Sequence, residues 1–150
     1  MRRIAPLFAA VILMVAAGSS LAAKNEKTSS TPALHGYCPV AYVAMGKAVK
    51  GDPKVAIVHE GHRYLFTNAD ARKMFEADPD KYQVAYEGWC ATAIAMGKKL
   101  ESDPTLFTVH EGTTYLFSGA EAKKAFDDMP DGVIEKADEQ WVALTKKSKK

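Results

Sequence analysis

Hydrophobic and polar residues alternate in two places along the chain, and each alternating stretch is interrupted by a glutamate and a glycine. Residues 55–59 and 62–66 flank Glu60-Gly61, and residues 106–110 and 113–117 flank Glu111-Gly112. Alternation with a period of two around a two-residue turn predicts a β-hairpin. The residues expected to share the inward face are Val55, Ile57, Tyr64 and Phe66 in the first hairpin and Leu106, Thr108, Tyr115 and Phe117 in the second.

Helical patterns flank both hairpins. Before them, short apolar segments at 40–45 and 92–96 end at glycine, which predicts short helices that stop there. After them, residues 67–70 and 118–121 have a capping-box pattern, and the apolar stripe that follows ends before a proline, Pro79 or Pro130. A last amphipathic segment, 134–144, predicts a C-terminal helix that packs on the body.

The same order of elements occurs twice because the sequence itself is repeated. Residues 45–80 and 96–131 align without a gap, and about half of these positions are identical. A unit of roughly 50 residues would be marginally stable alone, so we expect the copies to pack together. The predicted fold class is therefore α+β, with two tandem helix–β-hairpin–helix copies in one compact domain. We place the first copy at 35–86 and the second copy, with the C-terminal helix, at 87–145.

The N-terminal residues have the pattern of a secretory signal peptide, which we place at 1–23. Arg2 and Arg3 precede an apolar run at 4–17, and small residues follow at 20–23. The apolar run is shorter than the roughly 20 residues of a spanning helix. We therefore expect an exported protein, periplasmic or extracellular, with no stable membrane span after cleavage. Residues 24–34 are expected to be a flexible leader.

The balance of charged residues bears on whether the protein binds nucleic acid. The chain has 20 Lys and Arg and 18 Asp and Glu, so loss of Arg2 and Arg3 with the signal leaves equal numbers of basic and acidic residues. This balance gives no reason to expect nucleic-acid binding. The basic run at 146–150 is expected to be a solvated tail.

Several short motifs resemble the YHS domain, a small module of the TRASH-like metal-binding superfamily. They include Tyr64-Leu65-Phe66, the helix after it with Phe75, Asp78-Pro79, and Tyr82. The opening stretches, residues 36–42 and 87–91, are similar to those of exported YHS proteins. The resemblance covers residues 36–141 and implies a binding or accessory module whose ligand is a transition metal, copper or zinc.

The thiolate ligands that the resemblance implies are missing. Metal-binding relatives carry cysteines just after Tyr-x-Phe and in the opening turn, because soft thiolates hold zinc or copper in a closed set. In this chain the corresponding positions hold Thr67 and Ala71, Ser118 and Ala122, and Ala41. The closed thiolate site of the superfamily is therefore not expected here.

Cys38 and Cys90 occupy matching positions in the two copies. In an oxidising compartment they would form a disulfide between the copies. Two separate buried thiols are an alternative, since aromatic and apolar residues surround both. A metal or redox role is a third, although the chain has no Cys-x-x-Cys motif.

Histidines are the remaining candidate ligands. His59 and His110 both precede Glu-Gly at a hairpin tip, where an imidazole beside a carboxylate suits metal binding or acid–base chemistry. A simpler explanation is that both copies kept the sequence Val-His-Glu-Gly after the duplication because it forms the hairpin turn. His62 has Thr113 as its counterpart, and His35 has no histidine counterpart but lies close to Cys38 in sequence.

The sequence therefore predicts an exported, non-catalytic binding or accessory protein of the cell envelope, with no catalytic motif that we can identify. The alternatives are a structural or protein-interaction module with a Cys38–Cys90 disulfide and no metal, and a thiol-redox protein. The candidate metal ligands are Cys38, Cys90, His35, His59 and His110.

Overall fold

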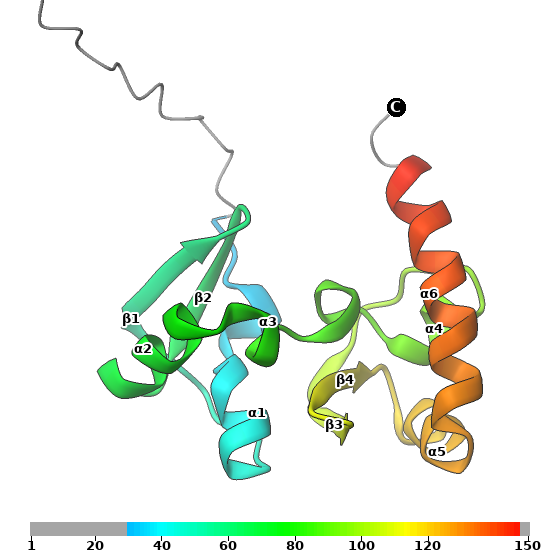
Figure 1. Cartoon of the computed structure of the whole chain (residues 1–150), viewed down its shortest axis with the longest axis horizontal. Helices are drawn as coiled ribbons and strands as arrows, with labels where there is room; N and C mark the ends of the chain where they lie inside the picture. The colour runs from blue at the N-terminus through cyan, green and yellow to red at the C-terminus, as the bar shows by residue number, and fades with distance from the viewer. Residues whose placement is uncertain (1–29, 148–150) are drawn as a thin grey trace, which may run out of the picture.

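The computed structural model describes residues 30–147 as a mixed α+β structure (Figure 1). The signal segment, most of the expected leader and residues 148–150 lie outside the described part. No helix within that part is long and apolar enough to span a membrane. In chain order the elements of the first half are η1 (Ala33–Gly36), α1 (Pro39–Met45), β1 (Asp52–His59), β2 (His62–Phe66), α2 (Ala69–Ala77) and α3 (Pro79–Tyr82). Those of the second half are η2 (Ala85–Gly88), α4 (Ala91–Ala95), β3 (Asp103–His110), β4 (Thr113–Phe117), α5 (Ala120–Asp128) and α6 (Pro130–Lys147). The elements η1 and η2 are short turns whose two central residues have left-handed backbone angles.

Two antiparallel hairpins make up the sheet structure, as the alternating pattern predicted. β1 pairs with β2 and β3 with β4, with the same register and a bulge near the start of the leading strand in both. Both central residues of each turn, Glu60-Gly61 and Glu111-Gly112, have positive φ. That conformation matches the twist of the flanking strands, which is why a two-residue turn closes each hairpin.

Aromatic side chains of the hairpins pack on the helix that follows each of them. In the first core the Tyr64 and Phe66 rings lie 5.1 and 5.4 Å from the ring of Phe75 on α2, centroid to centroid. All three side chains are at most 8% exposed. The prediction that this hairpin face meets the core is confirmed. The matching residues of the second core are Tyr115, Phe117 and Phe126.

The helices after the hairpins begin one residue later than the capping-box pattern implied. Asn68 is the N-cap of α2, and its side chain accepts a hydrogen bond from the backbone N–H of Ala71 (2.8 Å). Gly119 is the N-cap of α5 and has no side chain to contribute. Asparagine competes well with threonine for the cap position, so the local residue preference decided the start of α2.

Pro79 and Pro130 lie beyond the ends of α2 and α5, as expected, but each also begins a further helix. Proline suits the first helical position because it has no N–H that would lack a partner there. Pro79 begins the short α3, whose N-cap Asp78 accepts a hydrogen bond from Lys81 N–H (3.3 Å). Pro130 begins α6, which extends the predicted C-terminal helix in both directions.

Two boundaries predicted from composition differ from the structure. Pro32 bridges to Arg63 of β2, and Leu34 is 7% exposed in the first core, so the end of the expected leader belongs to the folded body. Lys146 and Lys147, expected in the solvated tail, form the last turn of α6. Lysines are favourable there because the helix dipole is negative at its C-terminus.

The second hairpin is packed on both of its faces. Tyr115 and Phe117 face α5, whereas Phe107 and Leu116, which pair directly across the strands, face the first copy and join its core. The ring of Phe107 lies 4.9 Å from that of Tyr42 on α1. In Figure 1 this hairpin accordingly lies between the first copy and the helices α5 and α6.

Candidate functional site

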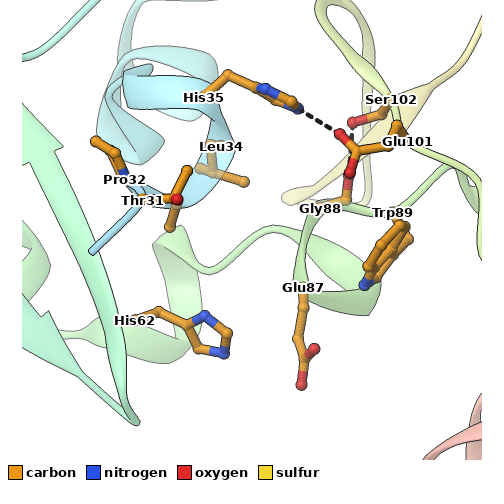
Figure 2. A pocket seen from close by; sticks show the side chains of 11 residues that line it. Thr31, Pro32, Leu34, His35, His62, Glu87, Gly88, Trp89, Glu101 and Ser102 are labelled. Carbon is orange, nitrogen blue, oxygen red and sulfur yellow. Dashed lines mark hydrogen bonds and ion pairs between the residues drawn. The ribbon is translucent and has the colours of Figure 1, made fainter. Parts of the chain in front are cut away.

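The candidate site is a cleft of about 250 Å³ where the two copies meet. We call it the inter-copy cleft. Figure 2 shows that its side chains come from η1 and β2 of the first copy and from η2 and the segment before β3 of the second. The polar and aromatic residues that line it include His35, His62, Glu87, Trp89, Glu101 and Ser102.

His35 and Glu87 enter the cleft from two matching left-handed turns. Leu34 and His35 have φ values of 54° and 52°, and Tyr86 and Glu87 have 54° and 55°. Such a conformation costs roughly 1–2 kcal/mol for each non-glycine residue. Burial of Leu34 and Tyr86 offsets part of this cost. Strained residues of this kind cluster at functional sites, which is one reason to consider the cleft.

His35 pairs with Glu101 across the cleft. Its Nε2 atom lies 3.4 Å from the Glu101 carboxylate, and the two side chains are 51% and 75% exposed (Figure 2). A pair this exposed contributes at most about 1 kcal/mol, so its value as a stabilising contact is small. The loop that carries Glu101 is anchored by Ser102, whose hydroxyl donates to the Gly88 carbonyl. The two groups are thus accessible and held near each other.

His62 and Glu87 occupy the other side of the same cleft. In Figure 2 their side chains point into the space between β2 and η2. The charge of Glu87 also reaches Tyr64, because burial, the charge of Glu60 and that of Glu87 together raise the Tyr64 pKa to about 12. The cleft therefore carries two carboxylates and two imidazoles, and with neutral histidines it is negatively charged.

The arrangement stops short of a preformed metal site. Within residues 30–147, no three His, Cys, Asp or Glu side chains lie close enough together to hold one metal ion. The cleft instead offers the His35–Glu101 pair, with a second imidazole and a second carboxylate facing it. A metal ion would need one of these to move toward the pair.

Cys38 and Cys90 do not form the predicted disulfide. Both are free thiols, both have 0% exposure, and each belongs to a different core. Each thiol is therefore enclosed by a different core cluster. Ser118 donates a hydrogen bond to the Cys90 sulfur (3.3 Å). Two separate buried thiols, one of the alternatives from the sequence, are what the structure contains.

His59 and His110 support the aromatic cores. The His59 ring lies edge-on to Phe75 (5.5 Å), and the His110 ring lies edge-on to Phe126 (6.3 Å). His110 also pairs with Asp131 (3.0 Å) at the start of α6. In both copies the histidine contacts the phenylalanine of the next helix, which gives both a common structural reason to have histidine at this position.

A comparison of the chain with family models, curated proteins and solved structures finds no match. The site is therefore defined by its own residues. His35 was named from the sequence, but Glu87, Glu101 and Trp89 were not. The internal repeat offered a signal for Glu87, which occupies the position that matches His35. Nothing local in the sequence pointed to Glu101, whose first-copy counterpart is Lys50.

Proposed function

We propose that this chain is an exported, non-catalytic accessory protein of the cell envelope, built from two YHS-like copies, that binds a transition-metal ion such as copper or zinc. The ion is placed in the inter-copy cleft, with His35 and Glu101 as its first ligands. The observation that carries the proposal is this accessible imidazole–carboxylate pair, which joins the two copies at 3.4 Å.

The chemistry of these donors suits the proposed ions. Imidazole nitrogen and carboxylate oxygen bind Zn²⁺ and Cu²⁺, whereas Cu⁺ prefers thiolates and thioethers. His62 and Glu87 line the same cleft and are the further imidazole and carboxylate donors that it offers. The negative charge of the cleft favours a cation over an anion.

The cysteines are not part of this proposal. A thiolate needs access to the ion, and both thiols are fully buried in separate apolar cores. The same burial removes the support for a thiol-redox protein, which would need an exposed thiol of lowered pKa. The ligands that we propose for the ion are therefore the imidazole and carboxylate groups of the cleft.

A structural or protein-interaction role is the second candidate. Phe107 and Leu116 of the second copy pack into the core of the first copy. This apolar contact holds the two copies together without a metal ion or a disulfide, which favours a structural role. A partner in the cell envelope would then bind without a metal ion.

Calorimetric titration of the mature protein with Zn²⁺ and Cu²⁺, together with metal analysis after dialysis, tests the proposal. We expect about one ion per chain, and a loss of affinity of at least about tenfold, or 1.4 kcal/mol, in His35→Ala and in Glu101→Gln. Glu121→Gln removes the same charge from α5 and is the matched control. Unchanged binding in both cleft variants would overturn the proposal, and absence of binding to any form would favour the second candidate.

A further inference from the structure

Lys99 lies between the faces of two tryptophans. Its Nζ atom is 5.6 Å from the ring centroid of Trp89 and 4.8 Å from that of Trp141 on α6. The Tyr86 ring packs edge-on against Trp141 at 5.8 Å and fixes that side of the arrangement. Two aromatic faces around one ammonium group form a cation-binding site, and its occupant is a side chain of the same chain.

The occupant is weakly held. Lys99 is exposed, and no carboxylate forms an ion pair with it within residues 30–147. A lysine ammonium is compact and strongly hydrated, so it loses hydration when it leaves water for an aromatic face. Quaternary ammonium groups are the ligands that aromatic cages recognise best.

The second copy alone builds this pair of rings. In the first copy Lys50 lies over a single ring, that of Tyr37 (5.4 Å), which matches Trp89 in sequence. The second ring comes from α6, which belongs to the second copy. The residue of the second copy that corresponds to Lys50 is Glu101, so a positive side chain in the first copy is matched by a negative one in the second. Glu101 lines the same cleft as Trp89.

We propose that Trp89 and Trp141 form a binding site for the quaternary ammonium group of a choline-type molecule, with Lys99 as an internal competitor that the ligand displaces. Glu87 and Glu101, which line the cleft beside Trp89, attract the cation toward the rings. The groups that contact the ligand here are the two aromatic faces and not the His35–Glu101 pair, although Glu101 supplies charge to both proposed sites.

Tryptophan fluorescence is a direct probe, because these are the two tryptophans of the whole chain. The mature protein is titrated with choline chloride, and sodium chloride at equal ionic strength corrects for salt. We expect a saturable change in wild type and, in Lys99→Ala, an affinity higher by at least about threefold, because the competitor is gone. Lys98→Ala removes the same charge from the neighbouring position and should bind as wild type does.

Trp141→Leu should abolish binding while keeping the circular dichroism spectrum, and Trp141→Phe should retain weaker binding if the ring face is what matters; binding in these variants is followed by calorimetry. A response no larger than that to sodium chloride in both wild type and Lys99→Ala would overturn the proposal. Undiminished binding in a folded Trp141→Leu variant would do the same. Vesicles of phosphatidylcholine, compared with phosphatidylglycerol and with free choline, distinguish a lipid headgroup from a soluble ligand as the source.

Discussion

The Tyr42 hydroxyl donates a hydrogen bond to the backbone carbonyl of Pro104 (2.9 Å), and so joins α1 of the first copy to β3 of the second. Tyr42 has 0% exposure, so this bond lies in the interior where the copies meet. Pro104 is buried as well, so its carbonyl is shielded from bulk solvent in the folded protein. The bond therefore reports on whether the two copies unfold as one unit.

Replacing Tyr42 with phenylalanine should lower the free energy of unfolding by about 1–2 kcal/mol, because a buried carbonyl is left without its donor. Chemical denaturation followed by circular dichroism measures the change. We expect one transition in both proteins. Tyr37→Phe is the control, since that hydroxyl makes no hydrogen bond to another described residue and its loss should change the free energy by less than about 0.5 kcal/mol. Two separate transitions in the variant would show that the copies unfold independently.

The buried thiols give a second prediction. Intact mass of protein purified from an exported preparation should be the same with and without reductant, because Cys38 and Cys90 are free and lie in separate cores. Thiol reagents should react slowly with the native protein and rapidly with two thiols per chain after denaturation. A mass lower by two hydrogens before reduction would instead establish the disulfide that the sequence suggested.

Local signals in the sequence were enough for the hairpins and not for the contacts between copies. Glu60-Gly61 and Glu111-Gly112 fix their turns through the backbone preferences of adjacent residues. A disulfide between Cys38 and Cys90 depends on how one copy is oriented on the other, and matching positions meet only if the copies are related by an axis that passes near them. The sequence of one copy does not specify how the other copy is oriented on it. For the same reason the sequence did not show that Glu101 lies beside His35 in the cleft.

Alkaline pH should destabilise the protein through its buried tyrosines. Burial, the charge of Glu60 and that of Glu87 raise the Tyr64 pKa to about 12, and burial also raises the pKa values of Tyr42, Tyr86 and Tyr115. A tyrosine in the unfolded chain loses its proton near pH 10, so above that pH the unfolded state binds fewer protons than the native state. Stability is then complete below pH 10 and falls as pH rises toward the native pKa.

The loss should reach about 1.4 kcal/mol per pH unit for each such tyrosine. Denaturation curves at pH 8, 10 and 11 measure it. Tyr64→Phe should reduce the slope between pH 10 and 11, whatever it does to stability at pH 8. An identical slope in wild type and variant would show that Tyr64 ionises at its ordinary pKa in the native state.

Thr114 gives the last prediction, because its buried hydroxyl has no hydrogen-bond partner among the described residues and its side chain is 1% exposed. Valine has the same shape without the polar group, so Thr114→Val should raise the free energy of unfolding by about 1 kcal/mol. Thr108 is the matched control: its hydroxyl donates to Asp127 (2.6 Å) and accepts from Lys123 (2.9 Å), so Thr108→Val should lower stability by about 1 kcal/mol. Destabilisation by Thr114→Val would show that a water molecule or another group satisfies this hydroxyl in solution.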